Sequence, residues 1–169
     1  MEDNITICLT KIVQEIAPDE IDLVPIVVQA FIAGGKKRQE LFHQEKNDIV
    51  GGFGGIEIEA ILPWILNGIM VAAPMLHYII SSGIVEKYLS VVKDLLSITK
   101  SLGQKKKIES LPDDPYEPLK QIITLISKEL DKAGISADKR DVIVYRLLRI
   151  LLENPVGGSQ VVQAIGGVR

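Results

Sequence analysis

The chain contains few side chains of the types that catalyse reactions, and their positions form no familiar catalytic arrangement. A nucleophilic triad needs a serine or cysteine, a histidine and an acid within hydrogen-bonding reach of one another. Cys8 is the only cysteine, and His43 and His77 are the only histidines. Cys8 falls on the apolar side of a predicted helix, where a free thiol is usually part of the core. We therefore predict no catalytic residue and no enzymatic activity.

Sequence patterns for metal ions and cofactors are also missing. The chain has no CxxC motif, no HExxH motif and no acidic calcium loop. Glu57 and Glu59 are two residues apart, a spacing that directs side chains to different faces of a helix. The glycine-rich run around Phe53 lacks the Lys-Ser/Thr pair of a phosphate-binding loop. We predict no metal and no cofactor, and we interpret the glycines of this run as a hinge: Gly51, Gly52, Gly54 and Gly55.

The composition is that of a folded protein with an excess of aliphatic residues. Of 169 residues, 47% are hydrophobic and 24% are charged, and the mean hydropathy is +0.23. The net charge is −3, with an acidic excess before residue 60 and a basic excess after it. No basic stripe interleaved with aromatic residues is present, so we predict that the protein does not bind nucleic acid.

The cysteine content and the N-terminus indicate a cytoplasmic protein. A single cysteine excludes an intrachain disulfide, which fits a reducing compartment. The first residues, Met1 to Asn4, are acidic and lack the basic start of a secretory signal. We predict a location in the cytoplasm or at the cytoplasmic face of a membrane.

One uncharged apolar segment, Ala60 to Val85, dominates the hydropathy pattern. It has no Asp, Glu, Lys or Arg over 26 residues, and a helix of roughly 20 apolar residues suffices to span a bilayer. Trp64 and Tyr78 lie near its two ends, where interfacial aromatic residues often occur. Pro74 lies in the middle of the segment and is expected to kink or break its helix.

Apolar residues at helical spacing predict an all-α fold. We expect a helical bundle around one long hydrophobic helix, at about residues 60–82, with an amphipathic companion helix and a C-terminal helical module. The short alternation at 56–59 is too brief to build a sheet. The further expected helices cover residues 5–16, 19–33, 84–102, 119–133 and 136–153, and a last helical turn or two lies at 159–165.

The same pattern divides the chain into four parts. We predict an N-terminal helical segment at 1–50, the hinge with the apolar and amphipathic helices at 51–103, a linker at 104–118, and the C-terminal module at 119–169. Pro112, Pro115 and Pro118 are expected to exclude a continuous helix across the linker.

Two further expectations concern the C-terminal module. Arg146 and Arg149 are placed on the solvent side of the helix at 136–153. The glycine pairs at 157–158 and 166–167 are interpreted as caps that follow helices.

These features favour a non-enzymatic protein that associates with or inserts into a membrane. The more specific hypothesis is a pore-forming or membrane-perturbing effector that self-assembles. Basic clusters at 36–38 and 105–107 suit an anionic surface, and Lys105, Lys106 and Lys107 are predicted to contact lipid headgroups. The residues predicted to enter the bilayer are Ile61, Leu62, Trp64, Ile65, Leu66, Ile69, Met70, Val71, Met75, Leu76, Tyr78, Ile79 and Ile80.

The alternative is a soluble helical adaptor or assembly subunit. In that case the apolar helix is a core or oligomer interface, covered by the amphipathic helices around it. The predicted partners are therefore a lipid membrane or another protein, with homo-oligomers expected under either hypothesis.

Overall fold

The computed structural model describes residues 2–42, 60–99 and 111–167. Within these residues the regular secondary structure is entirely helical. The prediction of an all-α fold around one long apolar helix, with a C-terminal helical module, is confirmed. The elements are α1 (Glu2–Ile16), the 3-10 helix η1 (Pro18–Leu23), α2 (Val24–Ala33), α3 (Gly35–Glu40), α4 (Leu62–Ile80), α5 (Val85–Thr99), α6 (Asp113–Lys132), α7 (Ala137–Glu153) and α8 (Pro155–Gly166).

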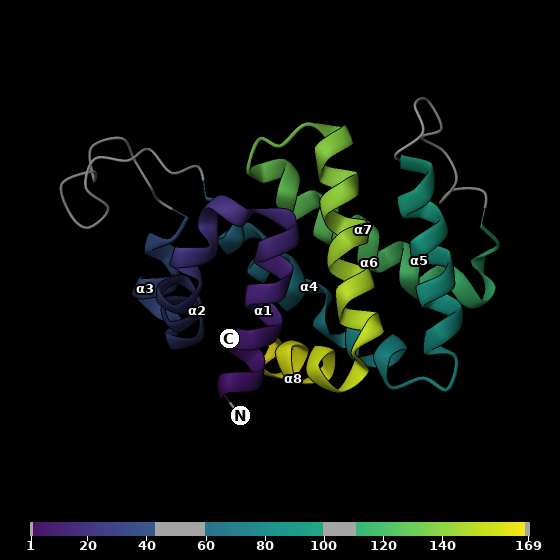
Figure 1. Cartoon of the computed structure of the whole chain (residues 1–169), viewed down its shortest axis with the longest axis horizontal. Helices are drawn as coiled ribbons and strands as arrows, with labels where there is room; N and C mark the ends of the chain where they lie inside the picture. The colour runs from purple at the N-terminus through teal and green to yellow at the C-terminus, as the bar shows by residue number, and fades with distance from the viewer. Residues whose placement is uncertain (1, 43–59, 100–110, 168–169) are drawn as a thin grey trace.

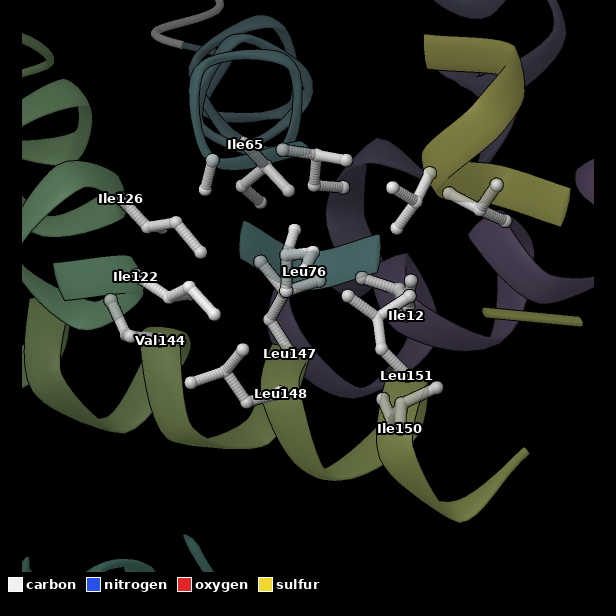
Figure 2. Packing of buried hydrophobic residues seen from close by; sticks show 14 of the residues in the cluster. Ile12, Ile65, Leu76, Ile122, Ile126, Val144, Leu147, Leu148, Ile150 and Leu151 are labelled. Carbon is white, nitrogen blue, oxygen red and sulfur yellow. The ribbon is translucent and has the colours of Figure 1, made fainter. Parts of the chain in front are cut away.

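The apolar helix α4 lies at the centre of the molecule. Its most extensive contacts are with α6 and α8, and α2 packs against it as well. In Figure 1, α4 runs behind α1 and α7, with α8 below and α6 beside it. Figure 2 shows the shared interior, in which side chains of α1, α4, α6 and α7 point toward one another: Ile12, Ile65, Leu76, Ile122, Ile126 and Leu147.

Pro74 does not break the apolar helix. α4 continues from Leu62 to Ile80 with Pro74 inside it. Proline removes only one main-chain donor and crowds the preceding turn. Because Pro74 lies on the exposed side of α4, water can reach the carbonyl group that loses its partner. Pro63 occupies the first turn, where no donor is needed.

The N-terminal region folds as two short elements where one helix was expected at 19–33. The 3-10 helix η1 begins at Pro18, and α2 begins at Val24. Pro25 is the physical reason, because it has no N–H with which to continue a helical ladder from η1. Proline is instead well tolerated in the first turn of a new helix.

The amphipathic helix α5 was predicted at 84–102 and is observed at Val85–Thr99. Its buried residues Tyr88, Val92, Leu95 and Leu96 form one face, and that face packs mainly against α7. The helices that cover α4 most closely are therefore α6 and α8.

Part of the predicted linker is helical. α6 begins at Asp113 and includes Pro115 and Pro118, so residues 113–118 of the predicted linker are helical, while Leu111 and Pro112 precede the helix. Pro115 falls in the first turn, where main-chain donors have no helical acceptor. The hydroxyl of Tyr88 donates a hydrogen bond to the carbonyl oxygen of Pro115 at 3.0 Å, which fixes this turn against α5.

The last helix was underestimated, since α8 starts at Pro155 and not near residue 159. Its first turn contains Gly157 and Gly158, both of which are buried, so the interpretation of this pair as a cap after a helix is wrong. The side chain of Asn154 accepts a hydrogen bond from the N–H of Gly157 at 3.2 Å and caps α8. A side chain at Gly158 would overlap the main-chain oxygen of Leu151.

Candidate functional site

The apolar helix α4 is the candidate site, and most of its predicted membrane-inserting residues lie inside the protein. Leu62, Ile65, Leu66, Ile69, Leu76, Ile79 and Ile80 are buried. Ile61, Trp64, Met70 and Met75 are half-buried, and Val71 and Tyr78 are exposed. In this structure α4 therefore presents one side of exposed and half-buried residues and buries the opposite side.

The N-terminus of α4 is held by a buried carboxylate from η1. Glu20 accepts hydrogen bonds from the main-chain N–H groups of Ile61 and Leu62, each at 3.0 Å. The first N–H groups of a helix lack helical acceptors and carry partial positive charge, so a carboxylate there satisfies both needs. Burial raises the pKa of Glu20; the two main-chain hydrogen bonds act to lower it, and Asp19 acts to raise it.

The one amide side chain inside the apolar segment has a partner on α6. Asn67 Nδ2 donates to Glu129 Oε2 at 2.7 Å, and Lys132 Nζ pairs with Glu129 Oε1 at 3.0 Å. Glu129 is buried, and each carboxylate oxygen has a partner. A buried charge is tolerable only when it is paired and hydrogen-bonded, so this network fixes the rotation of α4 against α6.

Small residues let α4 approach its neighbours closely. A Cβ atom at Gly68 would lie 3.2 Å from Ile126 Cγ2 on α6, and one at Gly166 of α8 would lie 2.5 Å from the Cβ of Ala73. Both distances are shorter than ordinary packing contacts. The two helices that cover α4 therefore fit against it at positions where glycine provides the space.

Aromatic and basic side chains cover the start of α4. The rings of Trp64 and Phe42 meet edge to face with centroids 4.7 Å apart, and Phe42 also contacts Phe31. Arg38 lies 5.5 Å from the centroid of the Phe31 ring and donates to the sulfur of Met70 at 3.5 Å. Arg38, a member of the basic cluster at 36–38, thus packs onto the protein.

Arg146 and Arg149 are not simply on the solvent side of α7. Arg146 donates to the main-chain oxygen of Glu15 at 3.1 Å, and Arg149 forms an ion pair with the Glu15 carboxylate. The expectation failed because α1 packs against α7, and periodicity within α7 cannot reveal that neighbour. The pair ties the C-terminal end of α1 to the middle of α7.

A second feature of interest is the uncovered face of α2. Ile26 is 55% exposed and Ile32 is 43% exposed, and Pro25, Gln29 and Ala33 between and beside them are exposed as well. At 100° per residue these five positions fall within an arc of about 120° on the helix. Gln29 is the only polar residue of the arc. We call these five residues the α2 face.

Among the described residues, no hydrogen bond or ion pair joins Cys8, His77 and Tyr145 to one another. Cys8 is buried, and burial raises the pKa of its thiol, which disfavours the nucleophilic thiolate. Burial likewise raises the pKa of Tyr145 to about 12. His77 is exposed on α4. No cluster of metal-ligating side chains occurs among the residues that the structure describes. The predictions of no catalysis and no cofactor stay predictions.

Several predicted site residues lie outside the described part of the chain. These are the hinge glycines Gly51, Gly52, Gly54 and Gly55 and the headgroup-contacting Lys105, Lys106 and Lys107.

Sequence reasoning missed Glu20 and Glu129, the two buried acids that hold α4. Asn67 was a usable signal, because an amide inside an apolar run needs a polar partner when it is buried. The identity of that partner was not readable, since Glu129 is 62 residues away.

Comparison with protein-family profiles, with characterised proteins and with solved structures finds no match for this chain.

Proposed function

We propose that this protein is a non-enzymatic helical assembly subunit or adaptor, with α4 as its core and the α2 face as its binding surface. The observation that carries the proposal is that two buried acids pair with α4, one with the main-chain donors at its start and one with the amide of Asn67. Glu20 binds the main-chain donors at its start, and Glu129 binds Asn67 within it. A helix selected to leave the protein has no need of two buried acidic partners.

The energetics of burial support the same proposal. Complete burial of one large aliphatic side chain contributes about 1.5–3 kcal/mol, and α4 contributes seven buried residues from the predicted membrane-inserting set. Removing α4 would also leave Glu20 without its main-chain donors and Glu129 without the amide of Asn67. The rest of the core would lose its centre, because α6 and α8 both pack on α4.

Membrane insertion by α4 is the second candidate function. Within the described residues α4 is the one helix long and apolar enough to cross a bilayer, although core helices of soluble proteins meet the same criterion. Val71 and Tyr78 are already exposed on it. In this candidate, a trigger releases α4 from α6 and α8, and inserted copies assemble into a pore or otherwise perturb the membrane.

Flotation of the purified chain with anionic liposomes tests the two candidates. An assembly subunit stays in the soluble fraction and causes no leakage of trapped dye. Flotation accompanied by leakage would contradict the proposal and establish the second candidate.

The Asp substitutions at Ile69 and Val71 separate folding from membrane binding. Ile69 is fully buried, so Ile69→Asp should unfold the protein, at a cost above about 4 kcal/mol. Val71 is 40% exposed, so Val71→Asp should keep the helical circular dichroism spectrum. In the membrane candidate, a charge near the centre of an inserted helix costs about 2.5–3.5 kcal/mol, and Val71→Asp should strongly reduce flotation.

The matched control is Val156→Asp, which adds the same charge at a 72% exposed position on α8. A wild-type chain that floats, with Val156→Asp unchanged and a folded Val71→Asp impaired, would assign membrane insertion to α4.

A further inference from the structure

We propose that the α2 face binds the α2 face of a second copy of this chain, in an antiparallel dimer with a two-fold axis at Gln29. The inference rests on the proposed function, since it names the partner of the assembly surface. It follows from three features of the described residues: the apolar character of the face, its symmetry about Gln29, and the charges beyond its two ends.

The residues of the α2 face are arranged symmetrically in the sequence. Ile26 and Ile32 lie three positions before and after Gln29, and Pro25 and Ala33 lie four positions before and after it. In an antiparallel pair centred on Gln29, a residue before Gln29 lies opposite the residue that follows Gln29 by the same number of positions on the other copy. Ile26 then meets Ile32 of the partner subunit, and the reverse contact occurs across the axis. Such a self-complementary patch is what a two-fold interface requires.

Gln29 suits the position on the axis. Its side-chain amide is both a donor and an acceptor, so two copies that face each other can exchange hydrogen bonds. The amide of Gln29, the single polar residue of the α2 face, can therefore be hydrogen-bonded by the Gln29 amide of the second copy. An unrelated apolar partner would leave this amide without a hydrogen bond, which is costly when the group is buried.

Charges of opposite sign flank the face and select the antiparallel orientation. Asp22 lies seven positions before Gln29 on η1, and Lys36 lies seven positions after it on α3. Both side chains are exposed, and neither forms an ion pair within the described residues. The antiparallel pair places Asp22 of each copy near Lys36 of the partner subunit, so the attractive contact occurs once on each side of the two-fold axis. A parallel pair would bring like charges together, which disfavours that orientation. Asp19 and Lys37 add the same signs at the same ends.

The position of α2 leaves room for a second copy. α2 and α3 lie at one edge of the molecule in Figure 1, away from α5 and α7. A stable interface buries at least about 1,200 Å² in total, more than one short helix supplies. The contact therefore includes the exposed sides of η1 and α3, and we expect a dimer that dissociates at micromolar concentrations.

The test is the mass of the full chain in solution, measured by light scattering or sedimentation over a concentration series. The wild type should shift from its chain mass of 18.6 kDa toward twice that value as the concentration rises. Ile26→Lys should raise the dissociation constant at least about tenfold, because it places a charge opposite Ile32 of the partner subunit. Val156→Lys, on the distant start of α8, should leave the dissociation constant unchanged. Circular dichroism should show both variants folded, since both positions are exposed.

A charge-exchange experiment tests the antiparallel register itself. Asp22→Lys alone and Lys36→Asp alone should each weaken self-association, because both contacts across the axis become repulsive. An equimolar mixture of the two variants should associate again, because each contact then joins opposite charges. The double variant Asp22→Lys/Lys36→Asp should likewise recover the wild-type dissociation constant.

The outcomes separate this inference from the proposed function. A wild-type chain that stays monomeric at several hundred micromolar overturns the proposed dimer. A dimer whose dissociation constant is unaffected by Ile26→Lys overturns the assignment of its interface to the α2 face. A mixture that associates no better than the single variants overturns the antiparallel register. None of these results requires membrane binding, whereas flotation with leakage overturns the assembly function whatever the mass in solution.

Discussion

At the residue scale, α4 depends on acids that come from other elements. Glu20 of η1 and Glu129 of α6 are buried carboxylates, one at the start of α4 and one beside its second turn. Burial in the protein interior disfavours an ionised carboxylate unless hydrogen bonds compensate for the lost hydration. Both acids have such bonds, so their substitution should report directly on how α4 is held.

Glu20 should make the stability of the protein depend on pH in an unusual direction. Its folded pKa is raised, chiefly by burial, so the folded state binds this proton more tightly than the unfolded state does. The contribution of Glu20 to stability is therefore largest below its ordinary pKa of 4.5 and falls as the pH rises through the raised folded value. Glu20→Gln removes this dependence.

The measurement is urea unfolding of wild type and Glu20→Gln between about pH 4 and pH 7. The free energy of unfolding of the variant minus that of the wild type should increase with pH. At low pH the variant should be the less stable protein, because its amide N–H₂ group faces a main-chain donor. Parallel pH profiles would show that Glu20 does not titrate across this range with a raised pKa.

The pairing of Asn67 with Glu129 should appear as an energetic coupling. Asn67→Ala should cost about 1–3 kcal/mol, because it leaves the buried Glu129 with one partner fewer. The double variant Asn67→Ala/Glu129→Ala should cost less than the sum of the two single variants, with a coupling of about 0.5–3 kcal/mol. Denaturant unfolding of the four proteins measures it. Additive effects would mean that the 2.7 Å contact contributes nothing to stability.

At the scale of the element, α8 shows how a glycine pair serves helix packing. Gly157 and Gly158 lie in its first turn beside Asn154 and Leu151, at the junction with α7. Glycine is unfavourable inside a helix by about 1 kcal/mol relative to alanine. Glycine is needed here because a side chain would not fit between α8 and the end of α7, and not because the backbone must be flexible. α8 must turn directly off the end of α7 to reach α4.

Gly158→Ala should therefore destabilise the protein although alanine favours helices. The added methyl group would overlap the main-chain oxygen of Leu151, and relieving such a clash typically costs about 1–3 kcal/mol. Thermal unfolding followed by circular dichroism measures the loss. Gly83→Ala is the matched control, since nothing lies within 4 Å of a Cβ atom there and its melting temperature should stay the same or rise slightly.

At the scale of the whole molecule, the buried residues form one cluster. It includes side chains from α1, α2, α4, α5, α6, α7 and α8, so the apolar helix and the C-terminal helices share a core. A small protein with a single core usually unfolds in one cooperative transition.

This common core predicts that α4 and the C-terminal module unfold together. Trp64, the only tryptophan, reports on the start of α4, and far-ultraviolet circular dichroism reports on all helices. The two signals should give the same midpoint and the same denaturant dependence. Two separated transitions would show that residues 119–169 form an independent module, as the sequence-based division of the chain proposed.

The sequence by itself determined the all-α class, the place and extent of α4, and the amphipathic character of α5. These properties are local, because helical spacing and an uncharged run of residues can be recognised without knowing any neighbour. The ends of α4 at Leu62 and Ile80 accordingly fall within a few residues of the predicted 60–82.

The tertiary structure alone decided which helices cover α4 and which residues hold it. The hydrogen bonds that Glu20 and Glu129 accept from Ile61, Leu62 and Asn67 join residues 41 to 62 positions apart in the chain, and no periodicity encodes contacts at such separation. It also decided the outcome for prolines and glycines, where intrinsic preference and packing conflict. Pro118 and Gly158 are poor helix residues in isolation, yet their helices form because the apolar faces around them are buried, a contribution that exceeds local preference.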